Sequence, residues 1–351
     1  MSVETKQREK LDYINVASVI SAFAVVMLHT NYVFWDYQPD TLFWKSANVI
    51  ETVCYFAVPV FFMISAATLM DFNKRYGIKT YFIKRFRRAV VPFVAWSFIG
   101  LAYKIYPLRY VSLQDITPKF IISGLLNGDL VDIYWFFIPL FCIYLSLPLF
   151  AAVPDEKRKT LFTYLAVAGF LLNILPPFLL GVTGKELPTG LSVGVVAGYL
   201  FYVPVGYLIS RYEITPKARI IIYVLGVSGL AMHMFGTFIY SRPAGQISGV
   251  FKGYQNVPCV LYSIAVFVFI RYATPHIMKH KPLAWLTNTL RTYTLSIYLL
   301  HIYVVRTLAR LFDGIGYSLT YRLLAPFGIV IIAVFGAWVI RKIPVVREIL
   351  P

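Results

Sequence analysis

The stretch INVASVISAFAVVMLHTNYVFW, residues 14–35, is the first long apolar run of the chain, and it carries one histidine, His29. About 20 apolar residues in a helix span a bilayer, so this run predicts a transmembrane helix. It is too long for the apolar part of a cleavable signal peptide. A histidine on such a helix is a functional-site hypothesis, although it can also serve only to hydrogen-bond a neighbouring helix.

The composition extends this prediction to the whole chain. Apolar residues make up 59% of the 351 residues, charged residues make up 14%, and the mean hydropathy is +0.69, which lies outside the range of soluble domains. Further apolar runs lie near residues 49–70, 89–106, 133–153, 161–182, 191–210, 219–238, 256–272, 286–305 and 323–340. We therefore expect an all-α polytopic membrane protein with about ten transmembrane helices, embedded in the lipid bilayer.

The basic residues orient these helices. The net charge of +17 comes from lysines and arginines that cluster between apolar runs, as in cytoplasmic loops, so a nucleic-acid partner is excluded. With the N-terminus inside, 22 of the 33 basic residues fall on the inner side, 10 fall on the outer side, and Arg291 lies within the ninth run. The positive-inside rule therefore places both termini in the cytoplasm, although Arg306, Arg310 and Arg322 run against the trend.

The chain shows no internal repeat and no soluble appendage. We expect one membrane-embedded domain over residues 1–351, with cytoplasmic tails at 1–13 and 341–351. Cys54, Cys142 and Cys259 lie in apolar runs without metal-ligand spacing, so we expect packing roles, no disulfide and no metal. The oligomeric state cannot be deduced from these patterns.

Seven basic residues lie between positions 74 and 88, ending in Lys84-Arg85-Phe86-Arg87-Arg88. Ordinary anchoring at the cytoplasmic surface explains such a cluster. The alternative is a phosphate site, because guanidinium groups bind phosphate bidentately and the N-terminus of the next helix adds its dipole.

Several polar or amphipathic groups are expected at one depth near the outer surface. The topology places His29, Glu51, the Tyr134-Trp135 pair and His301 there. A carboxylate near a histidine would orient it as a base. The alternatives are an aromatic belt for the tyrosine and tryptophan and an ordinary helix N-terminal carboxylate for Glu51.

These segments, taken in order, resemble the acyltransferase 3 family, the integral-membrane acyltransferases that modify bacterial surface glycans. The matching positions are 25–29, 58–65, 81–88, 91–92, 134–136, 144, 147–148, 206–208 and 293–301. The resemblance implies transfer of an acyl group, most often acetyl, from cytoplasmic acyl-CoA to a hydroxyl of an extracytoplasmic or lipid-linked glycan at the cell membrane. Acyl-CoA is then a donor substrate, and no permanently bound cofactor is implied.

The resemblance also implies roles for particular residues. His29 matches the family's general base, and Arg85 and Arg88 match the pair that grips the coenzyme A phosphates, with Lys84 and Arg87 beside them. The family's arginine about three helical turns before the histidine is absent.

Ser18 stands at the spacing of the missing arginine, and Asn15 is nearby. Arg8 or Lys10 of the N-terminal tail would supply the missing charge.

One face of the first helix is small and polar. Asn15, Ser18, Ala22, Val25 and His29 fall on it at 100° per residue. The rise from Ser18 to His29 is about 16 Å at 1.5 Å per residue, comparable with an extended pantetheine arm. We expect the donor to lie along this face, while close helix packing through small residues is the alternative.

These expectations combine into a mechanism. His29 would take the proton of an acceptor hydroxyl as it attacks the thioester, with Glu51 orienting the imidazole. An acyl-histidine intermediate is left open by the residues. Acceptor contacts are expected from Trp135, Tyr134, His301 and Asn31.

A polysaccharide or glycolipid exporter, or a secondary transporter, is the rival function, and a structural scaffold is a third. A transporter typically shows repeat symmetry and interrupted helices, which the sequence lacks. A basic cluster on one side only favours the enzyme.

Overall fold

The computed structural model describes residues 3–106, 108–185, 192–344 and 346–350, and the side chains of residues 1–11 and 347 lie outside this description. Every element in the described part is a helix or a helical turn. The contacts divide the chain into two compact units, residues 1–68 with 153–334 and residues 69–152 with 335–351. The expectation of one domain stays a prediction.

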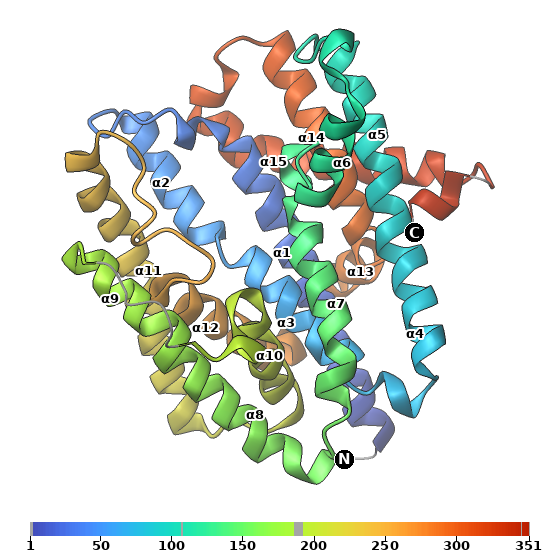
Figure 1. Ribbon diagram of the computed structural model, residues 1–351, viewed down its shortest axis with the longest axis vertical. Coiled ribbons are helices and arrows are strands. Elements are labelled where there is room, and N and C mark those ends of the chain that lie inside the picture. Colours follow the sequence, from blue (N-terminus) through green and yellow to red (C-terminus); the bar gives the residue numbers. More distant parts are fainter. Residues whose placement is uncertain (1–2, 107, 186–191, 345, 351) are drawn as a thin grey trace. The chain divides into compact units, whose positions relative to one another are not determined.

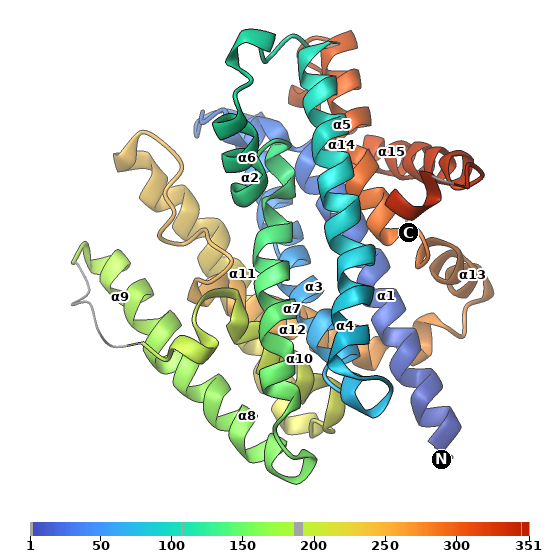
Figure 2. The ribbon, with the colours of Figure 1, turned by 45° about the vertical axis from the view of Figure 1, so that its right-hand side comes forward.

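The first unit is built around α1, which packs against α2, α12 and α14 (Figures 1 and 2). Its α-helices are α1 (Val3–Thr30), α2 (Leu42–Cys54), α3 (Ala57–Leu69), α8 (Asp155–Gly169), α9 (Leu175–Thr183), α10 (Tyr202–Arg211), α11 (Pro216–Ala244), α12 (Val257–Ile277), α13 (Lys281–Leu290), α14 (Thr294–Leu311) and α15 (Leu319–Ile340). The boundary between the units falls within two of them, so the last residue of α3 and residues 335–340 of α15 are assigned to the second unit. Short turns connect them: η1 (Tyr32–Trp35), η6 (Phe170–Ile174), η7 (Gly194–Val196), η8 (Gly198–Phe201) and η9 (Ile315–Tyr317).

The longest helix of this unit, α11, has clear end signals. The Thr215 hydroxyl accepts from the Ala218 amide, and Pro216 occupies the first turn, where a missing N–H is harmless. Gly245 ends the helix in the left-handed region at φ 63°. A Cβ at Gly229 would lie 2.6 Å from a carbonyl of α12, so the two helices pack backbone against backbone.

The core of the first unit joins α1 to α14 and α15. Ala22 and Val26 of α1 pack with Ile297 of α14 and Ile329 of α15, all of them at most 2% exposed. This cluster fixes the face that α1 presents to α14, and His29 lies two turns beyond Ala22.

The predicted run at 49–70 is not one continuous helix. Helix α2 begins earlier, at Leu42, and ends at Cys54, and α3 starts at Ala57. Pro59 has no N–H to donate to the Tyr55 carbonyl, so the helical ladder stops there. The Cys259 thiol lies 4.0 Å from that carbonyl instead.

Two other predicted runs also differ. Of the run at 191–210, residues 194–196 and 198–201 form short 3-10 turns and only Tyr202–Arg211 is α-helical, while residue 191 lies outside the described residues. The run at 286–305 is divided between α13 and α14, so the placement of Arg291 within a helix is wrong: it lies in the turn at 291–293. Thr292 donates its hydroxyl proton to the Thr289 carbonyl there, and such local bonds compete with the helix.

The second unit contains α4 (Ile78–Arg85), α5 (Val91–Ile105), α6 (Pro118–Asn127) and α7 (Phe137–Ala151). The turns η2 (Phe72–Lys74), η3 (Phe86–Val90), η4 (Leu113–Asp115), η5 (Asp132–Phe136) and η10 (Val346–Ile349) complete it. The π-helical turn η3 joins α4 and α5 into one rod, drawn in cyan (Figures 1 and 2). Trp96 Nε1 donates to the Ile349 carbonyl at 2.9 Å, which holds η10 on α5.

Among the described residues, eight helical segments are long and apolar enough to cross a membrane. The chain is therefore an all-α, multi-pass membrane protein, while the count of ten helices and the cytoplasmic termini are not confirmed. Cys142 is exposed, against the packing role expected for it, because it shares a face of α7 with the exposed Leu145 and Leu149. Cys54 and Cys259 are buried.

Candidate functional site

The centre of the candidate site is a pair of histidines in the first unit. His29 Nδ1 and His301 Nε2 lie 2.9 Å apart, with ring centroids 4.9 Å apart. His301 Nδ1 lies 2.9 Å from the Ile297 carbonyl, one turn earlier on α14. His301 is fully buried, whereas His29 keeps partial exposure. The two rings and the carbonyl thus form one chain of hydrogen bonds.

This chain determines where the protons lie. A carbonyl oxygen can only accept, so the proton of His301 is on Nδ1. A second proton on this fully buried ring, with its charge, would be costly, so Nε2 of His301 accepts from Nδ1–H of His29. The lone pair of His29 is then on Nε2. The arrangement gives His29 the tautomer of a base that is oriented by a second group.

Glu51, which the sequence predicts to orient His29, forms a buried ion pair. Its Oε1 lies 2.6 Å from Lys252 Nζ, and the two side chains are 6% and 4% exposed. The ammonium also lies over the rings of Tyr55, Phe34 and Trp35, at 3.8, 4.8 and 5.1 Å from their centroids. Glu51 therefore has a cation as its partner, and its action on His29 stays a prediction.

Lys252 is held by the connection between α11 and α12. Asn256 Nδ2 donates to the carbonyls of Gly249 and Val250 at 2.8 and 2.9 Å, which closes this loop. A Cβ at Gly236 would lie 2.2 Å from the Phe251 ring, so glycine is needed where the loop lies against α11. Burial lowers the pKa of Lys252, and the nearby carboxylate opposes this effect.

Helices α1 and α2 contact each other on both sides of His29 and Glu51. Asn31 Nδ2 donates to the Ala47 carbonyl at 2.9 Å, and Cys54 Sγ lies 3.9 Å from Met27 Sδ. The histidine of α1 and Glu51 of α2 lie between these two contacts. The acid and the imidazole are therefore at the same level on neighbouring helices.

Asn31, expected to contact the acceptor, is fully buried and has a protein partner at each end of its amide. Its Oδ1 accepts from Arg322 Nη1 at 3.2 Å. The same guanidinium donates to the Phe43 carbonyl and to Ser46 Oγ, at 3.1 and 2.8 Å. Arg322 thus ties α15 to the ends of α1 and α2. Arg322 itself is fully buried among these partners.

The donor face predicted on α1 is only partly open. Ala22 and Val25 are buried, and Ala22 belongs to the apolar core, as the packing alternative expects. Asn15 and Ser18 keep partial exposure. The side chains of Arg8 and Lys10 lie outside the described residues.

Tyr134 and Trp135 belong to the second unit, in η5. Tyr134 is fully buried with its ring edge-on to Phe137, so it does not form a lipid-facing belt. Gly128 adopts φ 71°, and a Cβ there would lie 2.9 Å from the Trp135 backbone. Trp135 itself is partly exposed.

The side chains of the basic segment, residues 74–88, have different neighbours within the second unit. The Arg85 guanidinium lies 5.6 Å from the centre of the Tyr144 ring, and its buried Nε has no hydrogen-bond partner among the described residues. Lys84 Nζ lies 3.9 Å from the centre of the Tyr76 ring. Arg88 is exposed, and Arg87 lines an apolar pocket. The phosphate roles of these residues stay predictions.

Two charged residues at the site were missed at the level of sequence. Lys252 and Arg322 each stand alone among apolar or aromatic neighbours. A carboxylate such as Glu51 in an apolar helix requires a cation as partner when it is buried. Glu51 is therefore the sequence signal that indicates a buried lysine or arginine nearby.

The fold and site define a multi-pass helical membrane protein with a hydrogen-bonded histidine pair and a basic segment at residues 74–88. A family model described as an acyltransferase domain matches residues 11–342, and the chain belongs to this family, the acyltransferase 3 family. The protein is therefore a membrane acyltransferase. No curated protein and no solved structure matches the chain.

Proposed function

We propose that this acyltransferase moves an acetyl group from acyl-CoA to a hydroxyl of a glycan or glycolipid at the outer face of the cytoplasmic membrane. The hydrogen-bond chain from the Ile297 carbonyl through His301 to His29 carries the proposal. It leaves a lone pair on Nε2 of a partly exposed imidazole, which general base catalysis requires.

The reaction uses this imidazole twice. Nε2 of His29 takes the proton of the acceptor hydroxyl while the oxygen attacks the thioester carbonyl. The carbon–sulfur bond then breaks, and the imidazolium returns the proton to the departing thiolate. Acetyl ester and free coenzyme A are the products, and no further reactant is needed.

His301 is a positioning residue in this scheme. It holds the His29 ring through Nδ1–H, so that the lone pair stays on Nε2. It also spreads the positive charge that develops on His29 towards the Ile297 carbonyl.

The donor side of the proposal rests on Arg85 and Arg88. The half-buried Arg85 lies over the Tyr144 ring, and its Nε has no hydrogen-bond partner in the described part of the chain. Arg88 is one turn further on and exposed. Guanidinium groups in this state suit the phosphates of coenzyme A. The family match favours this enzyme over an exporter.

The test is transfer of radiolabelled acetyl from acetyl-CoA to candidate surface glycans by the purified chain. His29→Ala should lower transfer by about 10²–10⁴-fold, the usual contribution of a general base. His276→Ala is the matched control, because this exposed histidine lies at the end of α12 and is given no role. Equal transfer by wild type and His29→Ala would contradict the proposal.

Arg85→Ala should raise the KM for acetyl-CoA and leave the KM for the acceptor unchanged. An unchanged donor KM would remove Arg85 from the donor site. This outcome is separate from the result for the base.

A further inference from the structure

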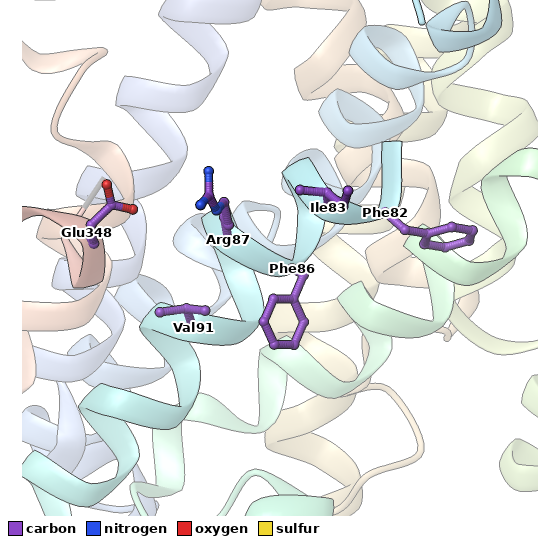
Figure 3. Close-up of a pocket in the computed structure, with 6 residues that line it drawn as sticks. All are labelled: Phe82, Ile83, Phe86, Arg87, Val91 and Glu348. Carbon is purple, nitrogen blue, oxygen red and sulfur yellow. The ribbon is translucent and has the colours of Figure 1, made fainter. Parts of the chain in front are cut away.

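A pocket of about 420 Å³ lies within the second unit, between η10 and the rod formed by α4, η3 and α5 (Figure 3). Its walls are Phe82, Ile83, Phe86, Arg87, Val91 and Glu348. The volume is in the range of small-molecule sites. Four of the six walls are apolar, and the two others carry opposite charges.

The π-helical turn η3 and the docked C-terminal segment create this pocket. A π turn changes the direction in which successive side chains point, and such turns are frequent at functional sites. Trp96 Nε1 holds the Ile349 carbonyl, and Arg341 Nε donates to the Leu350 carbonyl at 3.0 Å. Both bonds fix the segment that carries Glu348 next to the start of α5.

The apolar walls are open to their surroundings. Phe86 and Ile83 are 56% and 48% exposed, in a helical rod that is apolar enough to cross a membrane. In a bilayer such side chains contact acyl chains. The basic residues around them place this end of the rod at the headgroup level.

The two charged walls face the same space. In Figure 3 the Arg87 guanidinium and the Glu348 carboxylate extend in the same general direction from their helices, with the carboxylate turned towards the side on which Arg87 lies. No salt bridge joins them in the described part of the chain, so each is available to a ligand. A ligand that satisfies both carries an anionic and a cationic group close together, with an apolar tail.

We propose that this pocket binds an aminophospholipid of the phosphatidylethanolamine type. Arg87 holds the phosphate, Glu348 accepts hydrogen bonds from the primary ammonium, and an acyl chain lies along Phe86 and Ile83. A purely anionic headgroup places a negative charge next to Glu348, and a choline headgroup has no N–H to donate. This assigns Arg87 to the lipid rather than to the acyl donor.

Native mass spectrometry of the full chain in detergent tests this assignment. Phosphatidylethanolamine, phosphatidylglycerol and phosphatidylcholine with identical chains are added at equal concentrations. Wild type should bind phosphatidylethanolamine roughly tenfold more tightly than the other two, as expected for one charge-assisted hydrogen bond. Preference for phosphatidylglycerol, or no preference, would overturn the proposal.

Variants separate the two charges. Arg87→Gln should weaken all three lipids by roughly tenfold, and Glu348→Gln should remove only the preference for phosphatidylethanolamine. Lys79→Gln is the matched control, because Lys79 is an exposed lysine of α4 outside the pocket. A loss in Lys79→Gln equal to that in Arg87→Gln would show unspecific attraction and refute the site.

One further variant and one competition measurement complete the test. If Arg87→Gln aggregates, Arg87→Lys is used in its place, because it keeps the positive charge but lacks the planar guanidinium. Arg87→Lys should weaken lipid binding measurably but less than tenfold. Acetyl-CoA should leave bound phosphatidylethanolamine in place. One-for-one displacement by acetyl-CoA would assign the pocket to the acyl donor instead.

Discussion

Replacing Lys252 by methionine should destabilise the protein strongly, because it leaves the Glu51 carboxylate buried without its cation. The atoms of the pair are 2.6 Å apart and both side chains are at least 94% buried. Removing one partner of such a pair costs about 3–5 kcal/mol. Loss of the cation–π contact with Tyr55, at 3.8 Å, adds roughly 1 kcal/mol or more.

The double variant Glu51→Gln with Lys252→Met removes both charges together. Its stability should return to within about 1–2 kcal/mol of wild type, since replacing both members of a buried ion pair is often nearly neutral. The double-mutant cycle therefore predicts a coupling of at least about 2 kcal/mol.

The assay is unfolding of the full chain in mixed micelles with a rising fraction of dodecyl sulfate, followed by tryptophan fluorescence. Acetyl transfer is measured on the same samples before denaturant is added. If Glu51 acts mainly as the partner of Lys252, the double variant is stable and retains transfer. A double variant as unstable as the single one would refute the pairing argument. A stable but inactive double variant would show that Glu51 acts on His29, as the sequence predicts.

Four other outcomes follow from the geometry. His301→Phe should lower kcat about 10²–10⁴-fold with the donor KM unchanged. His301→Gln should retain a higher kcat than His301→Phe, because its amide oxygen can accept the hydrogen bond from His29. Equal losses of kcat in both variants would contradict the positioning role. Arg322→Ala should lower the free energy of unfolding by about 2–3 kcal/mol in the same micelle assay, since three hydrogen bonds to a buried guanidinium are lost. Gly206→Ala should destabilise by about 1–3 kcal/mol, because its Cβ would lie 2.6 Å from the backbone of α3, and an unchanged transition would contradict this packing. Burial lowers the pKa of Lys252 from 10.5, so between the lowered pKa and 10.5 the folded chain binds fewer protons than the unfolded chain. The free energy of unfolding of wild type should therefore rise relative to that of the double variant Glu51→Gln with Lys252→Met as the pH rises towards 10. A decrease in this difference would contradict the lowered pKa.

The membrane character of the chain could be predicted because hydropathy is a local property. The first apolar run, residues 14–35, covers most of the membrane span Asp12–Thr30 and includes His29, and the length of an apolar run is enough to identify it. The break between α2 and α3 has a local signal as well, in Pro59, although a hydropathy window averages over it. The turn at 291–293 has a weaker one, a series of threonines.

The partners within the site could not be predicted in the same way. His29 and His301 are 272 positions apart, and Glu51 and Lys252 are 201 apart. Depth in the membrane limits which residues can meet, but it does not say which faces of the helices are turned towards each other. That choice is made by packing, such as the contact of Ala22 with α14 and α15.

The position of one proton tests the central claim most directly. The chain contains five histidines, and ¹⁵N NMR of the histidine-labelled protein, with His29→Asn used for assignment, distinguishes protonated from unprotonated ring nitrogens. We predict a neutral His29 ring with its proton on Nδ1 and a bare Nε2, together with a His301 ring whose proton is also on Nδ1. A His29 ring protonated on Nε2 would have no lone pair there to accept the proton of the acceptor, and it would contradict the account.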